Sequence, residues 1–373
     1  MRRVDRICTA FACLLVALAS AGSAQATFPG RNGEIAYFDT YSLGGGLIEE
    51  GVLYGVCADG AGKRQLLSGG LPYTASATFS RDGRRLAASG QPHPKTDFDP
   101  VAIFVGGVEA HGMRRVTSTP RYVQDEDPVW SPKGDALAFT RQDSSTREKV
   151  RIYSGGRARV LTEGSKPAWS ARDEIAVVRR EYVPERDGEI TAIYIIPAMG
   201  GVAQRLTAGD EPNWSPDGQR LVFNSRRKGK TYIAVISRNG SRFRRLARGR
   251  SASWSPDGRL IVFRTPLGRR GRIDGYAAVV SPTGRGLRRL GPMGRNQPRP
   301  IISPDSRWVA AAWNSDLYVV RVDGTRRHYV ASNRREYLSL LDWRPLPASS
   351  PLSSPFGSIA NDPAHKSCGS QSS

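Results

Sequence analysis

The chain is poor in the residues that build most catalytic and metal centres, with four cysteines and four histidines among 373 residues. It contains no His-Glu-x-x-His metal motif, no Gly-x-Ser-x-Gly nucleophile turn and no Walker-type phosphate loop. The histidines His93, His111, His328 and His365 stand in dissimilar local contexts, so they do not predict a shared metal site. We therefore expect no catalytic residues, no bound metal and no cofactor.

Long apolar runs are equally scarce. The one strong run, Ile7–Ala19, follows three arginines and precedes the small residues Ala24–Ala26, a pattern typical of a secretory signal peptide over residues 1–26. The run is too short to span a membrane comfortably, and no later stretch is apolar enough to do so. We expect cleavage, a secreted or periplasmic location and a mature chain without a transmembrane segment. An uncleaved anchor is the alternative.

Removal of that segment would leave two cysteines, Cys57 and Cys368. Export to an oxidising compartment permits a disulfide between them. Spacing along the chain does not show whether two cysteines are close in space, so the pairing stays open.

A short repeat dominates the rest of the chain: an aromatic or apolar residue, a Ser-Pro-Asp-Gly turn or a variant of it, and a strand-like apolar run. Successive copies begin 51, 51, 39, 45, 40 and 48 residues apart, which is the period of one four-stranded propeller blade. No long helical periodicity follows residue 30, so the sequence predicts an all-β fold. The copies are Phe28–Gly33, Phe79–Gly83, Trp130–Gly134, Trp169–Asp173, Trp214–Gly218, Trp254–Gly258 and Ile302–Ser306.

The copy at Trp214–Gly218 shows how the repeat works. Pro216 presets φ at the first turn position, Asp217 suits the second, and Gly218 can adopt positive φ without steric cost. The pattern predicts a tight hairpin that joins two strands. We therefore assign Asp217 and Gly218, with Asp257 and Gly258 of the next copy, to turn structure and not to ligand binding.

The two ends of the repeat region complement each other. The first unit begins directly at its turn, Gly30–Gly33, whereas Tyr337–Pro345 is a Trp-containing strand with no hairpin after it. We expect this last strand to complete the first blade and close the ring. The count gives a seven-bladed propeller over residues 27–347, with six blades as the alternative. Residues 348–373 are rich in Ser, Pro and Gly and predict a disordered tail.

The Trp-Ser-Pro-Asp-Gly hairpin followed by a strand such as Leu221–Phe223 resembles the repeat of the TolB-type β-propeller family, over roughly residues 28–347. The resemblance implies a secreted or periplasmic propeller used mainly for binding. Similar propellers also precede serine peptidase domains, but the 26 residues after Pro347 are too few for one. Other propellers of this type stand alone as lyases. The resemblance implies that such a lyase would need histidines that hold a metal near the channel.

The formal net charge of +21 comes mostly from arginine, in clusters concentrated in the second half of the chain. One interpretation is a basic face for an anionic partner, such as an envelope polymer, an acidic protein or lipid headgroups. The other is that these arginines are solvated charges at hairpin tips. Nucleic acid is not an expected partner of an exported protein, and we expect a monomer.

Polar residues just before each predicted innermost strand should line one mouth of the central channel, where propellers present a concave surface. We expect an exported binding or scaffold module for protein, peptide or cell-envelope ligands. A small-substrate enzyme, lyase-like or hydrolase-like, is the alternative. Solvent exposure alone would also explain why the residues just before the innermost strands are polar. The candidate binding residues are Asp125, Asp127, Lys166, Asp210, Glu211, Arg250 and Arg299.

Overall fold

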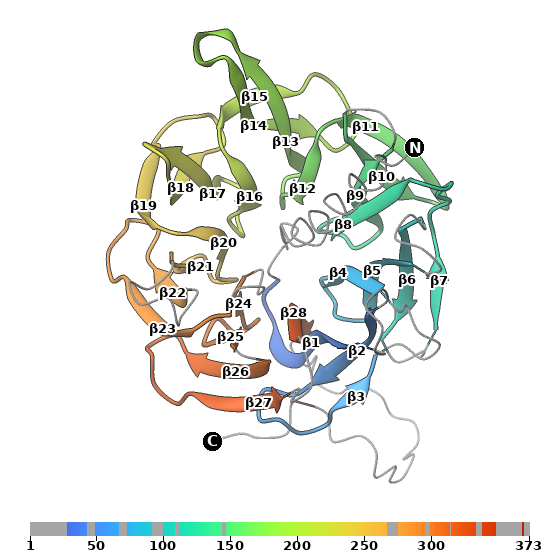
Figure 1. Ribbon diagram of the computed structural model, residues 1–373, viewed down its shortest axis with the longest axis vertical. Helices are drawn as coiled ribbons and strands as arrows, with labels where there is room; N and C mark the ends of the chain where they lie inside the picture. The colour runs from blue at the N-terminus through green and yellow to red at the C-terminus, as the bar shows by residue number, and fades with distance from the viewer. Residues whose placement is uncertain are drawn as a thin grey trace, which may run out of the picture.

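In this computed structural model, seven four-stranded antiparallel sheets surround a central axis, as blades of a propeller (Figure 1). The expectation of an all-β fold with seven blades, and not six, is confirmed. The structure describes residues 28–42, 49–66, 73–91, 100–108, 112–143, 147–266, 275–294, 299–313, 315–332, 338–347 and 368. The predicted signal peptide and all of the predicted tail except residue 368 lie outside these ranges.

Each blade runs from an innermost strand beside the axis to an outermost strand at the rim. Blade 1 consists of β28 (Leu338–Leu346), β1 (Arg31–Ser42), β2 (Glu49–Val56) and β3 (Arg64–Gln65). Blade 2 is β4 (Tyr73–Phe79), β5 (Arg85–Gln91), β6 (Ala102–Gly107) and β7 (Met113–Arg115). Blade 3 is β8 (Gln124–Trp130), β9 (Ala136–Gln142), β10 (Lys149–Ser154) and β11 (Arg157–Glu163).

The other four blades follow the same order. Blade 4 is β12 (Ser165–Trp169), β13 (Glu174–Val183), β14 (Gly188–Pro197) and β15 (Gln204–Ala208). Blade 5 is β16 (Asp210–Trp214), β17 (Arg220–Arg227), β18 (Lys230–Ser237) and β19 (Arg244–Arg248). Blade 6 is β20 (Arg250–Trp254), β21 (Ile261–Arg264), β22 (Tyr276–Val280) and β23 (Arg288–Pro292). Blade 7 is β24 (Ile301–Ile302), β25 (Trp308–Trp313), β26 (Asp316–Arg321) and β27 (His328–Ser332).

The ring closes as the sequence predicts, because the last strand of the chain pairs with the first. β28 lies antiparallel to β1, with Trp343 opposite Ile35 and Leu346 opposite Arg31. The first blade therefore combines both ends of the folded chain, and the ring has no open seam between blade 7 and blade 1.

The repeated hairpin has the geometry that its residues favour. In blade 5, the Gly218 amide donates to the Ser215 carbonyl at 2.8 Å, and Gly218 has φ of 66°. The Asp217 carboxylate accepts from the Ser215 hydroxyl at 2.5 Å and from the Gln219 amide at 3.0 Å. Asp217 is therefore part of the turn, and Asp257 makes the equivalent bonds to Ser255 and Arg259 in blade 6.

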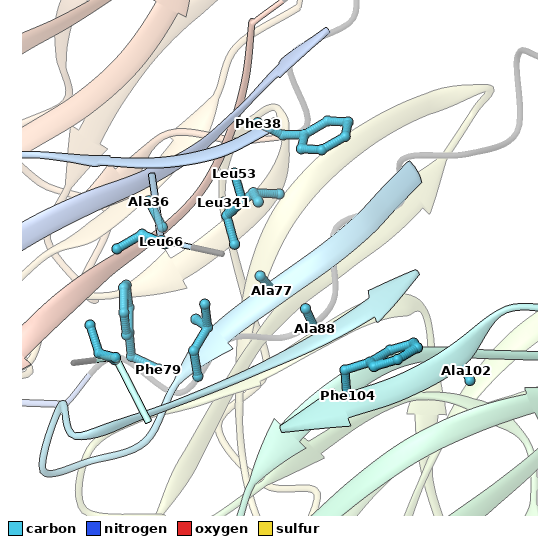
Figure 2. Close-up of a cluster of buried hydrophobic side chains, with 12 residues drawn as sticks. Ala36, Phe38, Leu53, Leu66, Ala77, Phe79, Ala88, Ala102, Phe104 and Leu341 are labelled. Carbon is cyan, nitrogen blue, oxygen red and sulfur yellow. The ribbon is translucent and has the colours of Figure 1, made fainter. Parts of the chain in front are cut away.

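The core lies between the blades, since each sheet buries both faces against its neighbours. Phe38 and Leu53 of blade 1 pack with Phe79 and Phe104 of blade 2 (Figure 2). The tryptophan that ends an innermost strand packs against the preceding blade, as Trp214 does against residues of blade 4. Its indole nitrogen also donates to the Ala168 carbonyl of that blade at 3.0 Å.

Arginines of three outermost strands join neighbouring blades at the rim. Each occupies the same register position beside the third strand of its own blade, and each donates through Nη1 to a backbone carbonyl of the following blade. The donor–acceptor pairs are Arg64 and Val108 at 3.3 Å, Arg244 and Thr283 at 3.0 Å, and Arg288 and Val322 at 2.8 Å. We call Arg64, Arg244 and Arg288 the rim arginines.

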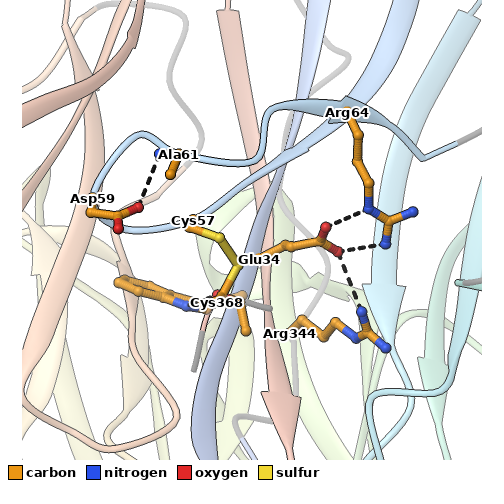
Figure 3. The surroundings of a disulfide bond; sticks show 9 residues. Glu34, Cys57, Asp59, Ala61, Arg64, Arg344 and Cys368 are labelled. Atoms are coloured by element: carbon orange, nitrogen blue, oxygen red, sulfur yellow. Dashed lines mark hydrogen bonds and ion pairs between the residues drawn. A yellow bond between two sulfur atoms is a disulfide. The ribbon is translucent and has the colours of Figure 1, made fainter. Parts of the chain in front are cut away.

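A disulfide joins Cys57 to Cys368, whose Cα atoms are 5.3 Å apart and which are separated by 311 residues in the sequence (Figure 3). Beside it in Figure 3, the buried Glu34 carboxylate accepts from Arg64 at 2.5 and 2.9 Å and from Arg344 of β28 at 3.4 Å. The pairing that the sequence left open is thus present, and it anchors residue 368 to the blade that closes the ring.

Helix is nearly absent from the part of the chain that the structure describes, where it is limited to the short 3-10 segment η1 (Pro184–Arg186). Within the described residues, no helix has the length and apolar character needed to cross a membrane.

Candidate functional site

Four neighbouring blades place a residue in the left-handed backbone region just after the start of their innermost strands. The φ values are 55° at Asp127, 50° at Lys166, 52° at Glu211 and 54° at Ser251. In each case the pairing with the second strand skips a register there, which marks a β-bulge. This conformation is unfavourable for residues other than glycine, and bulges redirect side chains. The same strained position therefore recurs around the axis, three times with a charged side chain.

Blade 7 adds a cation to this set. Arg299 directly precedes Pro300, as Asp127, Lys166 and Glu211 precede a proline in their own blades, and its side chain is buried. We call Asp127, Lys166, Glu211 and Arg299 the axial charges. Their signs alternate in chain order: negative, positive, negative, positive.

The electrostatics show that these side chains from distant blades act on one another. Burial and the neighbouring Glu126 raise the pKa of Asp127 to about 7, although Lys166 and Arg299 oppose the rise. Burial lowers the pKa of Arg299, and the carboxylates of Asp342, Glu211 and Asp127 offset part of that effect. Asp127 and Glu211 lie in innermost strands and Arg299 lies just before one, so all three backbones are beside the common axis.

Lys166 has a direct partner, since its Nζ lies 3.1 and 3.3 Å from the two carboxylate oxygens of Asp210 in the next blade. Burial alone would lower the pKa of Lys166, but Asp210 and Glu211 outweigh it and raise that pKa. In contrast, Asp127 and Arg299 have no ion-pair partner in direct contact among the described residues. Charges of both signs thus face the axis without neutralising each other fully.

Asp342 completes the site from blade 1, and the sequence analysis missed it. Its carboxylate accepts from the backbone amides of Phe79 and Trp343, both at 2.8 Å, and from the Thr78 hydroxyl at 3.2 Å. Burial nevertheless raises its pKa to about 6. The signal that could have found it is its place directly before a repeat tryptophan, where the other blades carry no charged residue.

Two of the candidate binding residues have other surroundings. Asp125 is fully buried and accepts from Arg141 Nε and Nη2, both at 2.6 Å, within the β8–β9 pair. It is therefore occupied by a structural ion pair. Arg250 opens β20 with an exposed side chain and lies beside Ser251, whose amide donates to Asn224. Asp127, Lys166, Asp210, Glu211 and Arg299 are the predicted residues that the structure brings together.

Of the four histidines, for which no shared metal site was predicted, the structure describes His328. His328 lies on the outermost strand β27, where its Nε2 is 2.7 Å from the Ala58 carbonyl of blade 1. His93, His111 and His365 lie outside the described residues. Across the described ranges, no group of three or more His, Cys, Asp or Glu side chains has an arrangement suited to a metal ion.

Comparison with known proteins supports the fold. A family profile described as the TolB beta propeller domain matches residues 166–339. TolB from Acinetobacter baumannii aligns with a TM-score of 0.50 and 18% identity, over 66% of this chain and 63% of that one. This chain therefore spans less than two thirds of that TolB. A search of curated protein sequences found no significant match.

Propellers of enzymes are similar to the same degree. An oligogalacturonate lyase in complex with manganese aligns with a TM-score of 0.55 and 16% identity, over 82% of this chain and 87% of that one. The propeller domain of the Trilobed protease from Pyrococcus furiosus aligns with a TM-score of 0.58 and 13% identity, over 84% and 99%. At these identities the likeness concerns the fold alone. Residues 166–339 thus match TolB-type repeats, and the chain folds as a seven-bladed β-propeller.

Proposed function

We propose that this protein is an exported, non-catalytic binding module that holds a ligand of mixed charge, such as a peptide with free termini, at the axial site. The observation that carries the proposal is the set of axial charges. Asp127 lies in the innermost strand of blade 3 and Arg299 just before that of blade 7, and neither has an ion-pair partner in direct contact among the described residues. A ligand that carries an ammonium and a carboxylate group would supply the missing contacts to both.

Two further features support this function. The Cys57–Cys368 disulfide fits an oxidising compartment, in agreement with the signal-peptide pattern at the N-terminus. The strained backbone at Asp127, Lys166 and Glu211 recurs at the same position of successive blades, and strain of this kind concentrates at functional sites.

The test is calorimetric titration with a neutral tripeptide of alanine, with free termini and with acetylated and amidated termini. We expect the free form to bind and the blocked form to bind about tenfold more weakly or worse, because only the free form has both charges. Arg299→Gln should reduce binding to a similar extent, whereas the matched control Arg250→Gln should not, since Arg250 is exposed. Equal affinity of the two peptides, or binding of neither, would reject the proposal.

A small-substrate enzyme is the second candidate, and one observation favours it. A carboxylate whose pKa lies near 7, as that of Asp127 does, is suited to general acid–base catalysis at neutral pH. Mass spectrometry of the titrated peptide distinguishes the two functions. An intact peptide after prolonged incubation fits the binding module, whereas turnover that is lost in Asp127→Asn identifies an enzyme.

A further inference from the structure

A groove of about 790 Å³ lies between blades 5 and 6, away from the axial site. Its walls are the β16–β17 turn, the β18–β19 connection and the turn at Pro282 and Thr283 of blade 6. Asp210 and Glu211 begin β16, whereas the turn at Asp217 follows its end. The groove therefore opens at the opposite end of the innermost strand from the axial charges.

Arginine determines the charge of this groove. Four arginines line it, against a single carboxylate among the lining residues. That carboxylate, Asp217, is held by the Ser215 hydroxyl and the Gln219 amide, which lower its pKa against the effect of burial. It is therefore directed into its own turn and does not pair with the arginines. The four are Arg220, Arg238, Arg242 and Arg244.

The four guanidinium groups differ in how strongly they are engaged. Arg238 forms an ion pair with Glu174 of blade 4, and Arg220 lies over the Trp254 ring at 4.7 Å. Arg244 donates Nη1 to Thr283 and keeps an exposed side chain. Arg242 is exposed and makes no hydrogen bond, ion pair or ring contact with the described part of the chain. Arg242 can thus turn to an anion, and Arg244 can offer Nε and Nη2 to one while its Nη1 stays bonded to Thr283.

An apolar side chain adjoins these two arginines. Phe243 lines the groove and is 41% exposed. One face of its ring is covered by the Arg245 guanidinium at 4.8 Å, and the ring is tilted against Phe223 at 6.1 Å between centroids. The Arg245 guanidinium thus occupies one of the two faces on which a sugar ring could stack. The exposed part of Phe243 suits an aliphatic side chain.

We propose that the groove between blades 5 and 6 binds an acidic peptide segment of a protein partner, with carboxylates on Arg242 and Arg244 and an apolar side chain against Phe243. Guanidinium groups match carboxylates in a bidentate geometry, and arginine and aromatic residues dominate the affinity of protein interfaces. The site is separate from the axial site, so its occupation does not depend on the function proposed above.

The experiment measures the fluorescence anisotropy of a labelled octapeptide of alternating glutamate and leucine, added to the full chain. We expect saturable binding that the double variant Arg242→Glu and Arg244→Glu weakens by about tenfold or more, and the single variant Arg242→Glu by a smaller factor. The matched control is Arg226→Glu with Arg227→Glu, an exposed pair at the β17–β18 tip of the same blade. This control changes the net charge by the same amount as the double variant in the groove. It should leave the affinity for the peptide within about twofold of that of the unmodified chain.

Several results would overturn the proposal. Absence of binding would do so, and so would equal losses in the two double variants, which indicate attraction to net charge alone. Inorganic polyphosphate and a polyuronate are tested as competitors of the labelled peptide; if either displaces it more strongly than the unlabelled peptide does at equal charge, the groove belongs to a different anion. Circular dichroism and melting temperature establish that each variant is folded. Arg299→Gln should leave this binding unchanged and so separates it from the axial site.

Discussion

The rim arginines of this propeller are held by the neighbouring blade, whereas the axial charges have few direct contacts. Arg244 and Arg288 each donate to a backbone carbonyl of the next blade. Asp127 and Arg299 are more enclosed, and burial disfavours the charged form of both. Part of the large positive charge is therefore architectural, and the less satisfied charges lie in or just before the innermost strands.

The same contrast occurs within one strand, at Asp125 and Asp127 of β8. Asp125 is bonded twice to Arg141, whereas Asp127 two residues later has no ion-pair partner in the part of the chain that the structure describes. We expect Asp125→Asn to lower the free energy of unfolding by about 3 kcal/mol, because it leaves the charge of Arg141 without its partner. Asp127→Asn should change it by less than about 1 kcal/mol, since it removes a poorly solvated charge and asparagine tolerates positive φ.

Urea denaturation at pH 7 measures both variants, with the slope of the transition as the check that each remains two-state. The comparison fails if Asp127→Asn is as destabilising as Asp125→Asn. That result would mean that Asp127 is a structural group like its neighbour, and the axial site would lose its main support.

The pH dependence of stability tests the axial charges directly. Burial raises the pKa of Asp127 from 3.8 to about 7, so the folded state binds a proton that the unfolded state has already released. Stability from this group is therefore present at low pH and is lost as pH rises from about 4 to about 7. Asp342, whose pKa is raised to about 6, contributes in the same direction.

We expect the free energy of unfolding to fall by roughly 2–4 kcal/mol between pH 5 and pH 7.5, and to fall less in Asp127→Asn. Glu189→Gln, which removes an exposed carboxylate, is the control and should keep the original profile. A profile that Asp127→Asn leaves unaltered would place the titrating group elsewhere.

The fold was predictable because its determinants are local and repeated. Asp217 and Gly218 specify a turn by themselves, and the copies of that turn mark the blades. The axial set was predictable in part, since Asp127, Lys166 and Glu211 precede the proline of each innermost strand. The bulge at that position was not, and it decides that Asp127 faces the axis while Asp125 is buried against Arg141.

Two features that depend on ring closure were not predicted from the sequence, although the closure itself was. Asp342 belongs to the axial set only because β28 returns to blade 1, and no proline stands two residues before Trp343 as one does before the tryptophans of blades 3, 4 and 5. The Cys57–Cys368 disulfide depends on the same closure, because its partners are 311 residues apart. Local patterns carry no information on such distant neighbours.

The smallest expected effect concerns the rim. Arg244→Ala and Arg288→Ala each remove one hydrogen bond to the next blade, at 3.0 and 2.8 Å. We expect each to cost about 0.5–1.5 kcal/mol of stability, and the double variant to cost about the sum, because the two bonds lie at different blade interfaces. Arg226→Ala, which removes an exposed arginine at a hairpin tip, should cost less than about 0.5 kcal/mol. Equal effects of all three substitutions would show that the rim arginines are only solvated charges, and the excess of arginine would then need an explanation outside the architecture of the ring.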